Sequence, residues 1–502
     1  MSIEPLRLHR NEGRPPHRDL FEGLSETGPE LARRYPEGED VRDLLASRLG
    51  VSPECVLVTA GADDAIDRIC RCWLAPGKEL LVHEPTFQMI PLYGRMTGAT
   101  IVSVGDMWTE FPVEAMREAV TDATGMAAVV TPNNPSGAVA SADELAKVAE
   151  ALPPDAVLLV DAAYVEFADD DPTAAVLELP NVIVTRTLSK AWGLAGLRVG
   201  YAVSTPEIIE RLQSVGSPYP VSTLALELAA RELRTGGDRM KAYVDRVREE
   251  RTRLVGILEA RGLQPLPSQA NFVFFGSGRA EWIQAALSAV GVQVRKLESW
   301  PDGLRITCPG DPDDLARLEQ ALDAVLAPRA ILFDMDGVLA DVSGSYRASI
   351  RETVESFGAT VDNEEVDELK AAGNHNDDWI LTREILANRG IELPLEEVIQ
   401  RFESFYQGQD GIPGLRTTET LLAPPGWIQS LADRFRLAVV TGRPRADAAR
   451  FLEEHGIASA FEVVVAREDA PSKPDPAPVR RARQQLGAAR AVCIPLLDLV
   501  IG

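Results

Sequence analysis

Short apolar runs alternate with segments of helical periodicity up to about residue 327, and this alternation leaves the chain few folds to adopt. The runs have the length and the β-branched content of buried strands. They lie at 79–83, 127–131, 156–160 and 182–185, between helical patterns such as 62–74 and 141–152. The alternation predicts an α/β fold in which helices cover both faces of a parallel sheet. Ligands bind at the carboxyl ends of such strands, so Asn134, Asp161 and Lys190, which follow three of the runs, are candidate site residues.

The pattern starts again at Ala330, where the apolar run AILF opens a second α/β series that continues to Gly502. Only three residues separate this run from a helical pattern over 312–326. A helix-rich stretch at about 345–425 interrupts the second series, as an inserted cap would. A chain of 502 residues is too long for one core. The sequence therefore predicts two domains, 1–327 and 328–502.

Composition excludes several classes of partner. A net charge of −25 argues against nucleic acid and against anionic membranes. No apolar run approaches the roughly 18 residues of a membrane span, and the N-terminal segment lacks the apolar stretch of a signal peptide. The five cysteines form no C-x-x-C pair, so we expect reduced thiols. These features predict a cytoplasmic enzyme.

The segment from Thr185 to Tyr201, TRTLSKAWGLAGLRVGY, carries the most chemistry. It sets Lys190 beside two hydroxyls, those of Thr187 and Ser189, and ahead of Arg198. Lysine amines form Schiff bases with carbonyl compounds, and hydroxyls with a guanidinium suit a phosphate dianion. Pyridoxal phosphate is an aldehyde that carries a phosphate, so the segment predicts a site for this cofactor.

This segment resembles the cofactor-lysine signature of the class I and II aminotransferases, closest to their histidinol-phosphate branch. Further motifs extend the resemblance over about residues 5–325: Gly-Ala-Asp at 61–63, Pro-Thr-Phe at 85–87, TPNNPSG at 131–137 and DAAY at 161–164. The resemblance implies the large and small domains of pyridoxal-phosphate fold type I, at about 35–235 and at about 1–34 with 236–327. It implies that the cofactor is bound by Ala62, Asp63, Phe87, Asn134, Asp161, Tyr164, Thr187, Ser189, Lys190 and Arg198.

Each implied role has a physical reason. A carboxylate at Asp161 keeps the pyridine nitrogen protonated, so that the ring withdraws electrons; with Lys190 and Tyr164 it forms the catalytic set. A helix that begins near Asp63 offers N–H groups to the phosphate. Phe87 would stack on the ring, and Asn134 and Tyr164 would share its 3-oxygen. Taken singly, Asp63 and Asp161 also suit helix caps, Phe87 a core position and Asn134 a turn.

Substrate and subunit contacts are implied by the same resemblance. Tyr35 matches the tyrosine that reaches the cofactor phosphate of the neighbouring subunit, which implies a homodimer. Arg305 matches the residue that binds the substrate α-carboxylate. Arg295 matches a position that contacts the substrate phosphate in the histidinol-phosphate branch, although an exposed charge without a ligand is the alternative. The string NEGRPPH at 11–17 lacks the aromatic residue of that branch, so a substrate other than histidinol phosphate stays open.

The second domain resembles the haloacid dehalogenase-like (HAD) phosphatases. In FDMDGVLAD, at 333–341, the resemblance makes Asp334 the nucleophile and Asp336 the general acid/base, with Mg²⁺ held by both. Thr441 in VVTGRP and Lys473 in SKPDP match the second and third motifs, which bind the phosphoryl group. The fourth, acidic motif is replaced by PLLDLVIG at 495–502, where Asp498 is the only carboxylate. We expect a Rossmann-like domain with a helical cap, incomplete at its C-terminus and with weakened Mg²⁺ binding.

The sequence thus predicts a pyridoxal-phosphate-dependent aminotransferase that acts on a small amino acid or amino phosphate and on keto acids. Its HAD domain is either a phosphatase or a non-catalytic module. An active phosphatase would suit the fusion, because transamination and dephosphorylation are consecutive reactions in histidine synthesis. The alternative keeps the cofactor but changes the reaction to decarboxylation, β- or γ-elimination or carbon–carbon bond formation.

Overall fold

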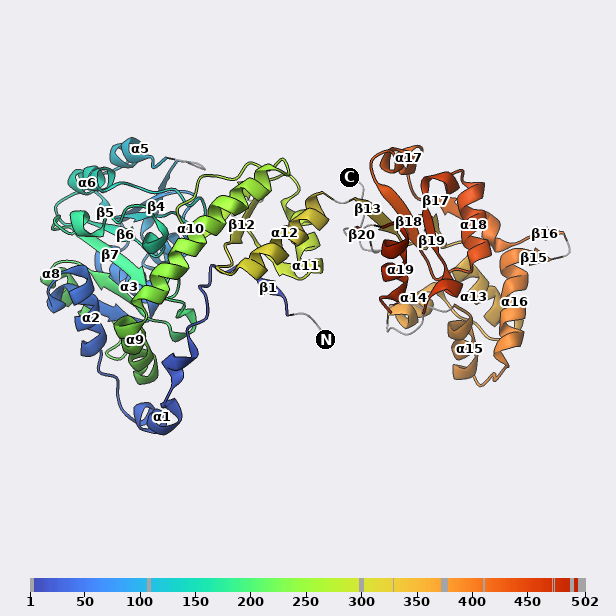
Figure 1. The fold of residues 1–502 in the computed structure, drawn as a ribbon, viewed down its shortest axis with the longest axis horizontal. Helices are drawn as coiled ribbons and strands as arrows, with labels where there is room; N and C mark the ends of the chain where they lie inside the picture. Colours follow the sequence, from blue (N-terminus) through green and yellow to red (C-terminus); the bar gives the residue numbers. More distant parts are fainter. Residues whose placement is uncertain are drawn as a thin grey trace. The chain divides into compact units, whose positions relative to one another are not determined.

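The structure is a computed structural model that describes residues 4–105, 110–297, 302–327, 329–371, 378–409, 411–471, 473, 475–487 and 492–494. Contacts divide the chain into two units, Met1–Leu322 and Asp323–Gly502 (Figure 1). The predicted domain boundary at 327/328 lies close to this division and stays a prediction, as do the subdivisions of each domain.

A seven-stranded sheet forms the centre of the first unit, in the order β2-β8-β7-β6-β5-β3-β4. Its strands are β2 (Val56–Thr59), β3 (Glu79–His83), β4 (Thr100–Val104), β5 (Thr124–Val130), β6 (Val157–Asp161), β7 (Val182–Thr187) and β8 (Gly200–Val203). The pairs from β4 to β7 are parallel, as predicted, whereas β8 is antiparallel to both of its neighbours. The chain passes from β7 to β8 through residues 188–199, which include the 3-10 helix Ala195–Leu197, and β8 then lies antiparallel beside β7.

Helices cover both faces of this sheet because its strands are apolar on both sides. Along β5, Met126, Ala128 and Val130 enter one buried cluster, whereas Ala127 and Val129 enter the other. The first cluster includes residues of α3 (Gly61–Trp73), α4 (Met89–Met96) and α8 (Pro206–Ser214). The second includes residues of α5 (Val113–Glu118), α6 (Ala142–Ala151) and α7 (Thr173–Val176).

Two smaller sheets of the first unit bring its N-terminal segment beside its C-terminal part. The strand β1 (Leu6–Arg7) pairs in parallel with β10 (Val292–Gln293), and β12 (Gly303–Thr307) lies between β11 (Arg295–Lys296) and β9 (Phe272–Gly276). The remaining helices of this unit are α1 (Leu24–Arg33), α2 (Glu39–Leu49), α9 (Thr223–Thr235), α10 (Gly237–Glu259), α11 (Ala280–Ala289) and α12 (Pro312–Leu326), the last continuing into the second unit. The pairing with β10 fixes where the N-terminal segment runs.

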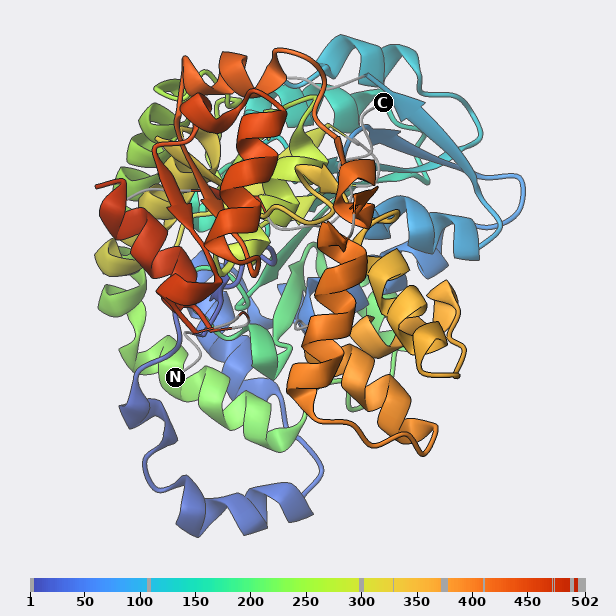
Figure 2. The same ribbon diagram turned by 90° about the vertical axis from the view of Figure 1, so that its right-hand side faces the viewer.

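The second unit has a four-stranded parallel sheet in the order β19-β18-β13-β20. Its strands are β13 (Ala330–Phe333), β18 (Arg436–Val440), β19 (Val463–Val465) and β20 (Val492–Ile494), and its helices α17 (Trp427–Ala432), α18 (Arg445–Glu454) and α19 (Ala477–Gln485). Four more helices pack together as the inserted segment (Figures 1 and 2): α13 (Tyr346–Ser356), α14 (Asn363–Ala371), α15 (Asp378–Asn388) and α16 (Leu395–Gln407). The predicted truncation at 495–502, with Asp498, lies outside the described residues.

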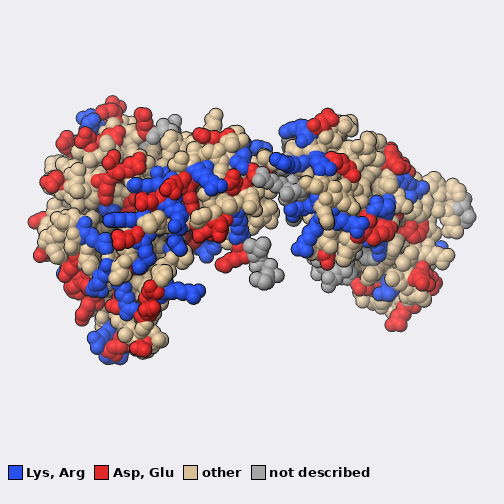
Figure 3. Space-filling model, viewed as in Figure 1, with Lys and Arg blue, Asp and Glu red and all other residues tan. Residues whose placement is uncertain are grey.

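Two surface properties bear on the predicted partners. Acidic and basic side chains are mixed over both units on the face drawn in Figure 3. Within the described ranges, no helix combines the length and the apolar character needed to cross a membrane.

Candidate active site

A cavity of about 340 Å³ lies in the first unit, where β5, β6 and β7 end. Asp161 is the last residue of β6 and Thr187 the last residue of β7, and Asn134 follows β5. Because these strands are parallel, their carboxyl ends share one edge of the sheet. The structure therefore brings together every predicted cofactor residue except Tyr35: Ala62, Asp63, Phe87, Asn134, Asp161, Tyr164, Thr187, Ser189, Lys190 and Arg198 all line the cavity.

Asp161 is a buried carboxyl, 3% exposed. Its Oδ1 accepts hydrogen bonds from the backbone N–H of Ala163 at 3.2 Å and from the hydroxyl of Thr185 at 3.4 Å. Burial, the dominant cause, raises the pKa of Asp161 to about 7. A neighbouring cation would lower this pKa again, so the site favours a positively charged group beside Asp161.

Lys190 reaches the cavity from the loop after β7. Its Nζ donates a hydrogen bond to the carbonyl oxygen of Arg10 at 3.3 Å and lies 5.6 Å from the ring centroid of Tyr164. The N-terminal segment passes so close that a Cβ at Gly13 would lie 2.1 Å from the carbonyl oxygen of Lys190. Only glycine fits this approach, and the sequence reasoning missed its role within the string NEGRPPH.

Asn11, also missed from the sequence, orients Tyr164, one of the two predicted partners of the ring oxygen. Its side-chain amide donates to the hydroxyl of Tyr164 at 2.9 Å, and its φ of 54° is one that asparagine tolerates. On the other side, Asn134 accepts a hydrogen bond from the guanidinium of Arg305. Asn11 is the first residue of the string NEGRPPH, in which the aromatic residue of the histidinol-phosphate branch is missing. That difference could have drawn attention to Asn11 from the sequence.

Two hydroxyls and a guanidinium form a cradle beside the first turn of α3. Thr187 donates to Ser189 at 2.9 Å, and Arg198 donates to Ser189 at 3.4 Å and pairs with Asp63 at 3.0 Å. Arg198 adopts a φ of 52°, a strained conformation of the kind that clusters at functional sites. A Cβ at Gly61 would lie 2.5 Å from the Arg198 guanidinium. The helix N-terminus, the hydroxyls and the guanidinium suit a phosphate group.

The amine of Lys190, the buried carboxyl of Asp161 and the cradle together fit a phosphorylated aldehyde with a basic ring nitrogen. The amine of Lys190 can bond the carbonyl carbon, the buried carboxyl can face the ring nitrogen, and the cradle can hold the phosphate. The aromatic ring of Phe87 lines the same cavity and can contact a ring face.

The predicted substrate residues lie on the small sheet beside the cavity. Arg305 is 7% exposed, and its guanidinium donates to neutral acceptors, the side-chain oxygen of Asn134 and, at 3.1 Å, the carbonyl oxygen of His9. Among the residues that the structure describes, none accepts a hydrogen bond from its Nε. Burial lowers the pKa of Arg305. A buried guanidinium without a carboxylate partner favours an anionic ligand.

In the second unit, some of the predicted site residues contact each other and others contact a residue that was not predicted. Lys473 pairs with Asp334 at 2.7 Å, whereas Asp336 accepts a hydrogen bond from the Nε of Arg443 at 2.6 Å. Thr441 is buried, and its hydroxyl oxygen accepts from the backbone N–H of Arg443 at 3.1 Å. Arg443 was missed, although it stands in the string VVTGRP only two residues after Thr441.

Arg443 also joins this site to the segments that lead into and out of the inserted helices. Its guanidinium donates to Glu419 at 2.8 Å, and both side chains are buried. Glu419 in turn accepts hydrogen bonds from Ser345 at 2.7 Å and from Tyr406 at 3.1 Å. Among the described residues, no cluster of three or more His, Cys, Asp or Glu side chains is placed to hold a metal ion.

Comparisons with known proteins agree with both halves of this description. Residues 30–322 match the family of class I and II aminotransferases, and residues 331–495 match the haloacid dehalogenase-like hydrolases. A histidinol-phosphate aminotransferase of Rhodospirillum centenum is 36% identical over 335 residues, which are 64% of this chain and 90% of that protein. An aromatic amino acid aminotransferase of Cutibacterium acnes is 34% identical over 330 residues, covering 64% of this chain and 92% of that protein.

Solved structures show the same likeness. The histidinol-phosphate aminotransferase of Sinorhizobium meliloti, solved in complex with pyridoxal-5'-phosphate, superposes with a TM-score of 0.59 at 26% identity. The match covers 64% of this chain and 91% of that one.

Proposed function

The chain belongs to the class I and II aminotransferases and continues into a haloacid dehalogenase-like domain, and we propose that it transaminates a small amino acid or amino phosphate with pyridoxal phosphate as its cofactor. The observation that carries this proposal is the single cavity that holds an amine, a buried carboxyl and a phosphate cradle. The matched relatives named above favour transamination over the other reactions that this cofactor supports.

Several of the predicted site residues have a defined task in this proposal. When bound, pyridoxal phosphate supplies an electron sink for the charge that develops at the substrate α-carbon. Asp161 holds a proton on the ring nitrogen, and the amine of Lys190 moves a proton at the α-carbon. Arg198 with the two hydroxyls of its cradle anchors the phosphate. Arg305 holds the α-carboxylate in a buried position, which orients the α-carbon toward Lys190.

Borohydride reduction followed by peptide mass spectrometry tests the cofactor assignment. Wild-type protein supplied with pyridoxal phosphate should carry it on the peptide that contains Lys190, and Lys190→Ala should carry none. Transamination should then convert an amino donor to its keto acid in equal amounts with the new amino acid. Release of CO₂ or ammonia in place of this exchange would show another reaction.

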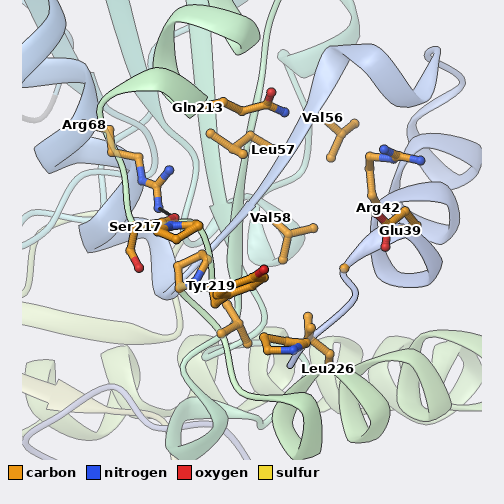
Figure 4. A pocket seen from close by; sticks show the side chains of 15 residues that line it. Glu39, Arg42, Val56, Leu57, Val58, Arg68, Gln213, Ser217, Tyr219 and Leu226 are labelled. Carbon is orange, nitrogen blue, oxygen red and sulfur yellow. Dashed lines mark hydrogen bonds between the residues drawn. The ribbon is translucent and has the colours of Figure 1, made fainter. Parts of the chain in front are cut away.

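We also propose a homodimer in which Tyr35 reaches the neighbouring active site. Tyr35 is 78% exposed and does not line the cavity of its own chain; it stacks on Tyr219, itself 51% exposed, at 4.8 Å. Tyr219 belongs to the wall of a second cavity of about 330 Å³ (Figure 4). The buried Arg68, which also lines this cavity, donates hydrogen bonds to the carbonyl oxygens of Leu212 in α8 and of Ser217 in the loop before Tyr219. A structured, exposed pair of aromatic rings supports burial against a second subunit.

Complementation between subunits tests this arrangement. Lys190→Ala and Tyr35→Ala proteins should each have low activity, and mixed dimers should recover part of it. In the mixed dimer, the Tyr35→Ala subunit keeps its own Lys190 and receives Tyr35 from its partner. A mixture that forms heterodimers without recovery would show that Tyr35 does not act between subunits.

The second unit is proposed as a Mg²⁺-dependent phosphatase, because its structure pairs the expected nucleophile, Asp334, with the expected phosphoryl-binding cation, Lys473. Asp334 and Asp336 are the described residues that would hold Mg²⁺, which would offset the negative charge of the phosphate. Hydrolysis of an aryl phosphate in the presence of Mg²⁺, lost in Asp334→Asn, is the expected result. If wild type and variant are equally inactive, the unit is a non-catalytic module.

A cytoplasmic location also remains a proposal. Cys55, Cys70, Cys72 and Cys308 form no disulfide among the side chains that the structure describes, which supports a reducing compartment. Cell fractionation with an antibody against the chain would test it, since recovery from the exported fraction would contradict this location.

A further inference from the structure

The side chain of Asn11 is buried beside the cofactor cavity, and both of its polar atoms have partners. Asn11 is 1% exposed. Its Oδ1 accepts a hydrogen bond at 2.9 Å from the hydroxyl of Thr307, the last residue of β12, and its Nδ2 donates to the hydroxyl of Tyr164 at 2.9 Å. The side-chain amide is therefore oriented with its N–H groups toward Tyr164.

The backbone at Asn11 is held by the same neighbours. Its N–H donates to the hydroxyl oxygen of Thr307 at 3.1 Å, and its carbonyl oxygen accepts from the side-chain amide of Asn271 at 3.4 Å. The carbonyl oxygen of Leu8 is a second acceptor for the Thr307 hydroxyl, at 2.9 Å. These contacts keep Asn11 at a φ of 54°, and residues held in such a left-handed conformation cluster at functional sites.

The hydroxyl of Tyr164 has a hydrogen that the protein itself does not use. A phenol has one hydrogen to donate and lone pairs with which to accept. The N–H of Asn11 occupies a lone pair, and among the residues that the structure describes none accepts a hydrogen bond from Tyr164. Tyr164 lines the cavity, and the Nζ of Lys190 lies 5.6 Å from its ring centroid. The hydrogen of Tyr164 is thus available to an acceptor in the cavity.

We propose that Asn11 is a positioning residue, which holds the hydroxyl of Tyr164 as a hydrogen-bond donor to the 3-oxygen of the cofactor. This inference rests on the proposed cofactor, whose 3-oxygen shares a proton with the nitrogen that joins the cofactor to Lys190. A hydrogen bond to that oxygen favours its anionic form, so the shared proton is lost at a lower pH. A hydroxyl that accepts a hydrogen bond also donates more strongly. Asn11 is not among the residues that line the cavity, so it acts through Tyr164.

Absorption spectra of the full-length, cofactor-loaded protein test this proposal without turnover. The visible absorption of the bound cofactor changes when the shared proton is lost, and a pH titration gives the midpoint of that change. Asn11→Gly removes the donor and keeps the backbone conformation, because glycine adopts a positive φ freely. It should raise the midpoint by roughly half to one pH unit, the range of one hydrogen bond. Asn11→Asp should raise it further, because its carboxylate would accept the hydrogen of Tyr164.

Two further variants separate an effect through Tyr164 from a direct one. Tyr164→Phe should itself raise the midpoint, and adding Asn11→Gly to it should change the midpoint by less than about 0.3 pH units. Asn181→Asp is the matched control, since the side-chain amide of Asn181 donates to the carbonyl oxygen of Ala149 at 2.9 Å. Asn181 directly precedes β7, at the opposite end of that strand from the cavity, so this variant should keep the wild-type midpoint.

Unchanged midpoints in Asn11→Gly and Asn11→Asp would overturn the proposal. An equal shift by Asn11→Gly with and without the Tyr164 hydroxyl would also overturn it. So would a smaller shift in Asn11→Asp than in Asn11→Gly, because the side-chain oxygen of Asn11 would then be the atom that faces Tyr164.

The same spectra distinguish this proposal from the proposed reaction. A wild type that titrates as expected and transfers no amino group would keep the role of Asn11 and refute the transamination. A wild type that carries no cofactor on Lys190 would refute both.

Discussion

Replacing Asp161 by asparagine should change how the stability of the cofactor-free protein depends on pH. In the folded protein the pKa of this carboxyl rises from 3.8 to about 7, chiefly through burial. Between these values the unfolded chain has released the proton and the folded chain still holds it. The free energy of unfolding must therefore fall as the pH rises through this window, and the decline must end near pH 7.

The magnitude follows from the two pKa values. One pKa unit corresponds to about 1.4 kcal/mol, so the full effect of burying Asp161 is roughly 4 kcal/mol above pH 7. From pH 5.5 to pH 7, the free energy of unfolding of the wild type should fall by about 2 kcal/mol relative to Asp161→Asn. The asparagine variant has no proton to release at this position, so the difference between the two proteins isolates one group.

Guanidinium unfolding of the cofactor-free, full-length proteins, followed by tryptophan fluorescence at several pH values, measures this difference. Trp73 and Trp192 are largely buried in the first unit and report on its unfolding. Adding pyridoxal phosphate should make the free energy of unfolding of the wild type less dependent on pH, because a cation beside Asp161 lowers the pKa of this carboxyl. Parallel pH curves for wild type and Asp161→Asn would refute the reasoning, since the carboxyl would then titrate alike in both states.

Three further outcomes are expected. Arg198→Met should raise the dissociation constant for pyridoxal phosphate roughly ten- to a hundredfold in a fluorescence titration, because a charge-assisted hydrogen bond is lost; an unchanged constant would remove Arg198 from the cradle. Gly13→Ala should lower the melting temperature well below that of Gly28→Ala, because its Cβ would lie 2.1 Å from a backbone oxygen whereas the control has no atom nearer than 3.9 Å; similar shifts would contradict the close approach. Arg443→Met should destabilise the second unit by about 3–5 kcal/mol in calorimetry, because it breaks a buried ion pair with Glu419, and a loss near zero would show that the pair is not formed.

That the candidate cofactor residues gather around one cavity could be predicted, because several of them follow apolar runs. Asp161 ends β6 and Thr187 ends β7, and parallel strands carry their ends to one edge of the sheet. Arg443 could not be predicted as the partner of Asp336. The two are 107 residues apart in the chain. They follow β13 and β18, and the sequence does not show that these two strands are neighbours in the sheet.

By itself, the sequence determined the secondary-structure elements and the sheet edge at which the candidate site residues lie. Periodicity and turn residues suffice for this, because they act over only a few neighbouring residues. Tertiary structure decided what closes the site. It placed β8 antiparallel to both β7 and β2, a direction that the pattern of apolar runs does not show. It also laid the N-terminal segment across Lys190, since β1 pairs with β10 far along the chain. Such contacts depend on the free energy of the whole packed unit, which no local pattern records.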